Sequence, residues 1–142
     1  MMTSGLLCAT DGSPISEKAV VFAADLARDL GQHLTFATVI TGVEDQTPVI
    51  WDEKAIVAGN LPPTRELLAA LNVAVRNGLQ RLTCVQLYGH GVAAAIVGYA
   101  EKNNYHHIVA GSAGLTGAKR LLLGSVAADI VALAHCPVTI VR

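Results

Sequence analysis

Residues 6–14 read LLCATDGSP, and they carry the clearest indication of the architecture. The apolar run 6–9 is typical of a short buried strand, and the polar residues 10–12 that follow it indicate a turn. Ser13 is a favoured N-cap residue, and proline, here Pro14, is favoured at the first position of a helix. The stretch therefore predicts a strand that turns directly into a helix.

Outward from this unit, strands and helices alternate along the chain. Apolar residues recur at helical spacing from Ile15 to Leu30 and include Phe22, and Gly31 is a typical helix stop. Further strands are predicted at 34–40, 82–87, 107–110 and 138–141. One helix is predicted to begin after the Thr64 cap, with one face formed by Leu67, Leu71, Ala74 and Val75. A second helix is predicted at 92–102. A third is predicted before the last strand, with an inner side formed by Val126, Ile130, Leu133 and Ala134. Residues 41–63 are the least regular segment, which is long enough to form a functional flap or to be partly mobile. The alternation predicts an α/β fold, a parallel sheet with helices on both faces.

Composition narrows the class of protein. The chain has 142 residues, 10 basic and 11 acidic side chains, and a net charge of −1, so we expect one domain, 1–142, with no charge pattern for nucleic acid or an acidic membrane. No apolar run reaches the roughly 18 residues of a membrane span. Cys8, Cys84 and Cys136 show no disulfide or zinc spacing. We expect a soluble cytoplasmic domain with reduced thiols.

The segment 111–126 is the strongest candidate for a binding function. It contains Gly111, Gly114, Gly117 and Gly124, which let backbone amides approach a ligand closely. Gly124 and Ser125 lead into the last helix, whose free N–H groups and dipole favour an anion. A phosphate cradle and a plain turn followed by an N-cap are equally compatible with the glycine content alone.

The pattern Gly111-x2-Gly114-x9-Gly124-Ser125 resembles the nucleotide-binding signature of the universal stress protein family. The resemblance extends along nearly the whole chain and includes the segments 9–13, 119–127 and 136–142. It implies an open five-stranded parallel sheet of order 3-2-1-4-5, which is Rossmann-like and similar to the adenine nucleotide alpha hydrolase fold. That order reverses between strands one and four, so Asp11 and Gly111 are expected to flank a ligand crevice.

The resemblance also implies a role for each site residue in an ATP-binding protein. Ala9, Thr10 and Asp11 would contact the nucleoside, and the backbone of Val39 would meet the adenine edge. The ribose and phosphates would be wrapped by Gly111, Ser112, Gly114, Leu115 and Thr116, and the phosphates held by Gly124, Ser125 and Val126. Mg²⁺ would be carried by the phosphates and water, without protein side-chain ligands. From the residues alone, Asp11 has an alternative role as a turn carboxylate.

Two positions depart from the family pattern. Ala113 and Leu115 stand where many relatives carry basic or polar side chains. Loss of charge there would weaken triphosphate binding or shift the preference toward AMP or ADP. Lys119 and Arg120 are near enough in sequence to compensate, or they form a solvated face.

The last strand, with Val138, Thr139, Ile140 and Val141, would be an edge without lysine, internal proline or inward charge. Pairing with its copy in a homodimer would cover it, and the resemblance implies the same dimer.

We therefore expect an ATP-binding sensing or regulatory module of the stress response, read by an unidentified downstream protein. No general base or nucleophile faces the predicted cradle, so any hydrolysis should be slow. A slow ATPase or nucleotidyl-transfer enzyme and a nucleotide-free dimeric interaction protein remain the alternatives.

Overall fold

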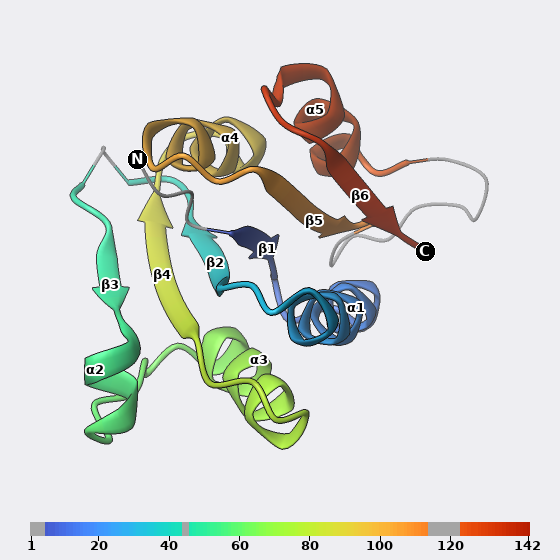
Figure 1. Ribbon diagram of the computed structural model, residues 1–142. Coiled ribbons are helices and arrows are strands. Elements are labelled where there is room, and N and C mark those ends of the chain that lie inside the picture. Colours follow the sequence, from blue (N-terminus) through green and yellow to red (C-terminus); the bar gives the residue numbers. More distant parts are fainter. Residues whose placement is uncertain (1–4, 44–45, 114–122) are drawn as a thin grey trace.

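The computed structural model describes residues 5–43, 46–113 and 123–142. Its described strands form one sheet in the order β3-β4-β2-β1-β5-β6 (Figure 1). The strands are β1 (Leu6–Ala9), β2 (Leu34–Ile40), β3 (Val49–Trp51), β4 (Leu82–Tyr88), β5 (His107–Gly111) and β6 (Val138–Val141). Every pair is parallel except β3 with β4. The predicted order of the five parallel strands is confirmed, but the described sheet has six strands rather than five.

The additional strand lies in the segment 41–63, for which the sequence predicted no regular element. In residues 41–63 the chain forms β3 and the short helix α2 (Glu53–Val57). β3 runs antiparallel to β4, with Ile50 opposite Val85. The Asp52 carboxylate caps α2 by accepting a hydrogen bond from the backbone N–H of Ala55 at 2.9 Å. Trp51 and Ile56 pack against the main core. Packing and strand pairing therefore order much of a segment that lacks a clear sequence period.

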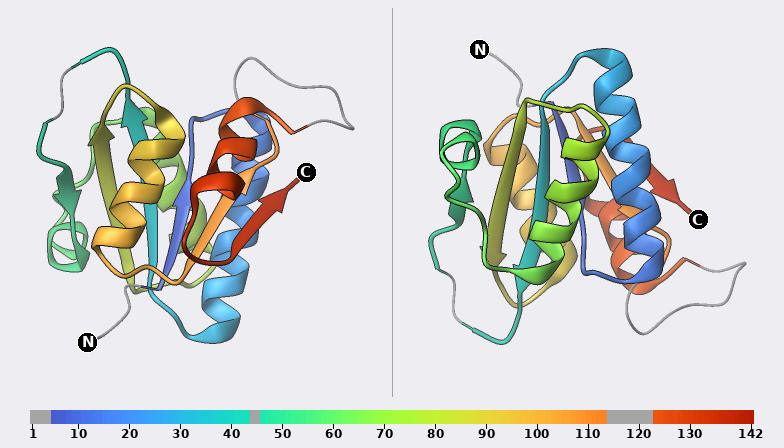
Figure 2. Two further views of the ribbon diagram at one scale, coloured as in Figure 1. Left: turned by 90° about the horizontal axis from the view of Figure 1, so that it is seen from above. Right: turned by 90° about the horizontal axis from the view of Figure 1, so that it is seen from below.

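Within the described residues, two helices cover each face of the sheet. α1 (Pro14–Leu30) and α3 (Arg65–Arg76) lie on one face, and α4 (Val92–Lys102) and α5 (Ser125–Leu133) lie on the other. The two views of Figure 2 show these helix layers in turn. The predicted limits of α1 are confirmed, because the Ser13 side chain accepts from the backbone N–H of Ser16 and Gly31 ends the helix with a φ of 65°.

Alternate residues of the strands lie on opposite faces of the sheet and pack into two hydrophobic cores. Leu6 and Cys8 of β1 pack with Phe36 on the side of α1 and α3. Leu7 between them packs with Ile108 and Ile130 on the side of α4 and α5. Both faces of this sheet are therefore buried, as expected for a parallel sheet with crossover helices.

Some helix positions that were predicted to face the core are exposed. They are Phe22 and Leu30 of α1, Val75 of α3, and Val126 and Leu133 of α5. The apolar stripe of each helix is wider than the surface that the sheet covers, so periodicity alone overestimated the buried face. Among the residues described, every helix is too short or too polar to cross a membrane.

Candidate functional site

A cavity of about 420–470 Å³ is found at each end of the sheet, and the larger lies at the carboxyl ends of β1, β2 and β5. β1 and β5 are neighbours although the chain reaches β2 directly after β1, so this is the point where the strand order reverses. Open parallel sheets bind ligands at such points. The starts of α4 and α5 supply the remaining walls.

Eight of the predicted site residues line this larger cavity. They are Ala9, Thr10, Asp11, Val39, Gly111, Gly124, Ser125 and Val126. Ser112 lies beside the cavity rather than in its wall and is buried. Gly114, Leu115 and Thr116 lie outside the described residues, as do Lys119 and Arg120. The structure thus brings together turns that are far apart in sequence, and the contacts of these residues with a nucleotide remain predictions.

The cavity is also lined by ten residues that were not selected from the sequence. They are Ser16, Ala37, Thr38, Thr41, Val92, Ile96, Ala110, Ala113, Ala127 and Ile130. One signal for Ala37 was available, because strand alternation places it on the same face as Val39. Ile96 and Ile130 carry no such signal, since both belong equally to the apolar core.

The loop after β1 is held in place by short hydrogen bonds. The backbone N–H of Thr10 donates to the carbonyl oxygen of Ala37 at 2.9 Å, which fixes the loop to β2. The Thr10 hydroxyl lies 3.3 Å from that of Ser16 in α1. The backbone N–H of Ser13 donates to Oδ1 of Asp11 at 2.9 Å. Asp11 therefore has the turn role that was its alternative interpretation, while its position also places it in the cavity wall.

The start of α5 is joined to the end of β5. The backbone N–H of Gly124 donates to the carbonyl oxygen of Ser112 at 2.7 Å, and the N–H of Ser112 donates to the carbonyl of Val141 at 2.8 Å. Gly124 is the N-cap of α5, and its cap position makes no side-chain hydrogen bond. The first N–H groups of a helix have no acceptor within the helix. This end of α5 therefore offers donors and a positive dipole end to the cavity.

The cavity has little side-chain charge. Among its described lining residues Asp11 is the only charged one, and the others are apolar or carry hydroxyl groups. An anion bound here would be held by backbone N–H groups rather than by a described cation. The described residues contain no cluster of three or more His, Cys, Asp or Glu side chains arranged to hold a metal ion.

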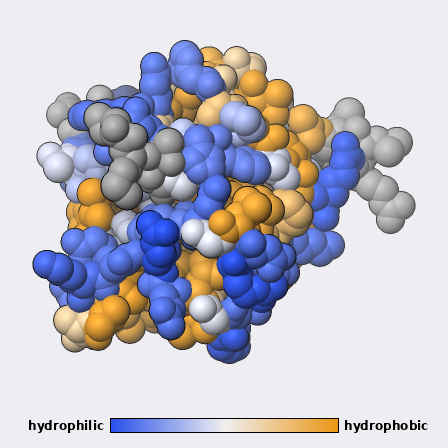
Figure 3. Space-filling view, in the orientation of Figure 1, coloured by the Kyte–Doolittle hydropathy of each residue, from blue (hydrophilic) through white to orange (hydrophobic). Residues whose placement is uncertain are grey.

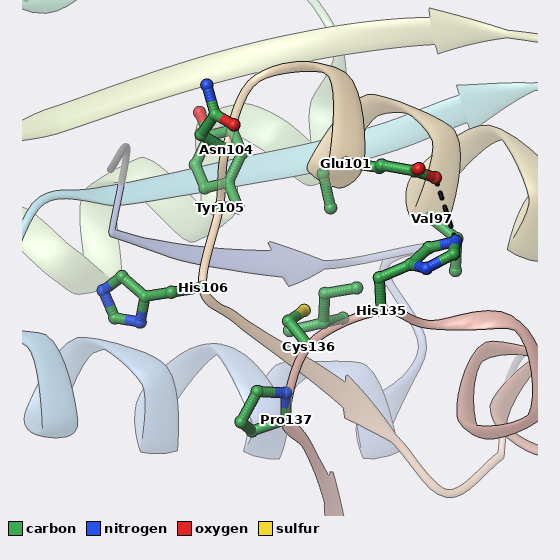
Figure 4. A pocket seen from close by; sticks show the side chains of 10 residues that line it. Val97, Glu101, Asn104, Tyr105, His106, His135, Cys136 and Pro137 are labelled. Atoms are coloured by element: carbon green, nitrogen blue, oxygen red, sulfur yellow. Dashed lines mark ion pairs between the residues drawn. The ribbon is translucent and has the colours of Figure 1, made fainter. Parts of the chain in front are cut away.

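The smaller cavity, about 420 Å³, lies between α4 and the turn before β6 (Figure 4). Glu101 and His135 point toward one another there, with 3.0 Å between the carboxylate and Nε2. Burial raises the pKa of the nearby Cys136 thiol, which favours its protonated form. Glu101 and His135 already contact one another and the thiol is not activated, so the cavity at the carboxyl ends of the strands is the candidate site.

Comparison with known proteins identifies the family. A family model described as the universal stress protein family matches residues 2–142. The chain belongs to this family. Over 151 residues it is 29% identical to the universal stress protein YxiE of Bacillus subtilis (strain 168), covering 99% of this chain and 100% of that protein. Over 50 residues it is 50% identical to a universal stress protein of Methanocaldococcus jannaschii, covering 35% of this chain and 29% of that protein.

Solved structures share the fold. A universal stress protein from Archaeoglobus fulgidus in complex with dAMP aligns with a TM-score of 0.71 and 24% identity over 100% of both chains. A universal stress protein in complex with cAMP aligns with a TM-score of 0.70 and 24% identity, covering 100% of this chain and 98% of that one.

Proposed function

We propose that this protein binds an adenine nucleotide in the cavity at the carboxyl ends of its strands and acts as a nucleotide-dependent sensing or regulatory module of the stress response. One observation carries the proposal: the Asp11 loop and the start of α5, which has no side-chain cap, flank a single cavity where the strand order reverses. Family membership supports it, as do two relatives of the same fold, one in complex with cAMP and one with dAMP.

In this proposal each wall of the cavity meets one part of the nucleotide. Ala9, Thr10 and Asp11 contact the nucleoside, and the backbone of Val39 meets the adenine edge. The start of α5, from Gly124 to Val126, binds phosphate oxygens through its N–H groups. Ser112, Gly114, Leu115 and Thr116 complete the phosphate loop on the strength of the sequence motif.

The charge of the described cavity wall favours a nucleotide with few phosphate groups. ATP is the ligand that the sequence motif suggests, but Asp11 is the only charged group that the described wall provides, and it is negative. We therefore propose that AMP or ADP binds at least as tightly as ATP. Asp11 is also the only carboxylate of that wall, and one of its oxygens accepts a bond from Ser13. Mg²⁺ would accordingly be held mainly by the phosphates and water.

The proposed module is a cytoplasmic homodimer formed by one domain, 1–142. β6 is an edge strand of the described sheet. Apolar surface also gathers in the region of α5 in Figure 3, where Val126, Val131 and Leu133 are exposed. A second copy paired through β6 would complete the sheet edge and cover part of this apolar surface. The downstream protein that responds to the bound state is unidentified.

Calorimetric titration with AMP and with Mg-ATP tests the nucleotide site. The nucleotide-stripped protein should bind AMP with a Kd in the micromolar range, about −8 kcal/mol. Asp11→Ala should weaken binding by about tenfold or more, which corresponds to about 1.4 kcal/mol. Asp25→Ala is the matched control, because Asp25 lies on α1 in an exposed pair with Arg28.

Two outcomes would contradict the proposal. No binding by the folded parent would favour the nucleotide-free interaction protein. Turnover of Mg-ATP faster than about 1 s⁻¹, abolished in Asp11→Ala, would place the protein among enzymes instead.

A further inference from the structure

A groove separates α1 from α3 on the sheet face opposite α4 and α5. The right-hand view of Figure 2 shows these two helices side by side. The groove has a volume of about 380 Å³. Its floor includes the buried side chains of Val20 and Ala70, and its walls include Val21, Ala69 and Val73. Alanine at two of these positions leaves room that larger side chains would fill, so apolar side chains line the middle of the groove together with the exposed Asn72.

Charged side chains mark the two ends of this groove. Glu17 and Glu66 lie at the end where α1 and α3 begin, and Arg76 lies where α3 ends. Within the part of the chain that the structure describes, none of the three forms an ion pair. Glu66 and Arg76 are separated by about 15 Å along the helix axis, at about 1.5 Å per residue. The groove is therefore as long as a helix of about three turns, acidic at one end and basic at the other.

We propose that this groove docks an amphipathic helix of a partner protein, antiparallel to α1 and α3. The apolar face of the helix would lie on Val20 and Ala70, as in other helix-in-groove complexes. A lysine or arginine in its last turn would face Glu17 and Glu66, and an acidic residue in its first turn would face Arg76. Helix dipoles favour this arrangement, because basic residues stabilise a helix C-terminus and acidic residues an N-terminus. The groove and a typical helix are thus complementary in shape and in charge.

The acidic end of the groove is shared with the proposed nucleotide site. Thr10 lines both the groove and the larger cavity, and Gly12 of the same loop lines the groove. A Cβ atom on Gly12 would lie 3.5 Å from Cβ of Glu66, so the loop is close to the start of α3. A ligand that moves this loop would alter the groove end. This coupling rests on the proposed nucleotide function, whereas the docking itself does not.

A displayed library of helical peptides of about 14 residues tests the docking. Its apolar positions are fixed at i, i+3, i+4 and i+7, and the first and last turns are randomised. Selection is made on the parent protein without nucleotide. The negative selection uses Ala69→Trp, whose indole would fill the groove from an exposed wall position. Val75→Trp is the matched control, because Val75 is exposed on the same helix outside the groove.

The expected result is enrichment of lysine and arginine in the last turn and of aspartate and glutamate in the first. Selected peptides should lose about tenfold or more in affinity on Ala69→Trp, bind Val75→Trp like the parent, and bind Glu17→Lys/Glu66→Lys about tenfold more weakly. Failure to select any binder, absence of the charge pattern, or equal binding to Ala69→Trp would overturn the docking. A change in the protein's own association state in Ala69→Trp would assign the groove to a second copy instead and overturn it too.

The nucleotide arm repeats the peptide titration with saturating AMP. The peptide Kd should change by about threefold or more if the shared loop couples the two sites. An unchanged Kd in a protein that calorimetry shows to bind AMP would overturn the coupling and leave the docking established. A protein that binds the peptide but not AMP would contradict the proposed function alone.

Discussion

The backbone N–H of Gly124 donates a hydrogen bond of 2.7 Å to the carbonyl oxygen of Ser112, although the two residues are well separated in sequence. This bond joins the start of α5 to the end of β5. A Cβ atom on Gly124 would lie 3.3 Å from both the Ser112 oxygen and Cα of Ala113, which is tighter than most Cβ contacts. Gly124 therefore has a structural reason to lack a side chain, beside the role that the phosphate motif gives it.

We expect Gly124→Val to move the start of α5 away from β5. The variant should bind AMP about tenfold or more weakly, because the N–H groups of the first helical turn would be displaced. Its free energy of unfolding should fall by about 1–3 kcal/mol from overpacking. Calorimetric titration measures the binding, and urea denaturation measures the stability.

Gly98→Ala provides the control for that experiment. Gly98 lies within α4, and a Cβ atom there would meet nothing within 4 Å. This variant should bind AMP like the parent and gain about 0.5–1 kcal/mol of stability from improved helix propensity. Parent-like AMP binding by Gly124→Val would show that the start of α5 is not the phosphate site.

At Gly111, which belongs to the same motif, α1 leaves no room for a side chain. A Cβ atom at this position would lie 2.9 Å from Cγ2 of Ile15 and 3.2 Å from its backbone. Gly111→Ala should therefore lower the free energy of unfolding by about 1–3 kcal/mol, measured by urea denaturation. Gly111→Ala should lower the free energy of unfolding by less in an Ile15→Ala background than in the parent, because only the contact with the backbone of residue 15 remains. Full stability in Gly111→Ala would mean that α1 can move away from β5 without cost.

His33 should make stability depend on pH. Its Nδ1 lies 3.3 Å from Glu53 and its Nε2 lies 2.8 Å from the Thr83 hydroxyl. Burial lowers the pKa of His33 below its ordinary value of 6.5, and this outweighs the opposing effect of the Glu53 carboxylate, while the Arg81 charge adds to the lowering. Just below pH 6.5 the unfolded chain then binds more protons at this site than the folded one does. The contribution of His33 to the free energy of unfolding therefore decreases as the pH falls through 6.5 and levels off below the folded-state pKa.

Urea denaturation between about pH 5 and pH 8 measures this effect. The urea midpoint of the parent should fall toward the acidic end, and His33→Gln should fall less. Some slope should remain in the variant, because burial and the neighbouring His106 also lower the pKa of His107. A slope that His33→Gln leaves unchanged would show that His33 does not titrate differently in the two states.

The parallel strands were predictable because each is a local apolar run that ends in a turn. The predicted limits of β1, β2 and β6 agree with the structure residue for residue. β3 was missed for a physical reason: Val49–Trp51 is too short to show alternation, and its partner β4 begins about thirty residues later. Local sequence cannot report a pairing whose other half lies far along the chain.

Some residues of the candidate site were likewise predictable from the sequence, and others were not. Asp11 and Gly124 were predictable because both match the family pattern and both stand in loops at the ends of helices or strands, where binding residues are common. Ile96 and Ile130 were not, since a side chain that faces a cavity and one that fills a core follow the same apolar period. Only the folded structure shows that these side chains of α4 and α5 line a cavity at the carboxyl ends of the strands.

The outward side of β6 provides the final prediction. The N–H of Ile108 donates to the carbonyl of Pro137, and the N–H of Ser112 donates to that of Val141. Strand alternation then turns the N–H groups of Val138 and Ile140 away from β5.

The outward N–H groups of β6 are the donors that a second copy would meet, so Ile140→Pro should remove one of them with little loss of pairing to β5. We expect Ile140→Pro to be monomeric by light scattering coupled to gel filtration, with circular dichroism like that of the parent. Ile140→Ala loses the same side-chain packing but keeps the N–H, so it should remain a dimer. A folded Ile140→Pro protein that still dimerises would place the interface away from β6, and a monomeric parent would remove the dimer altogether.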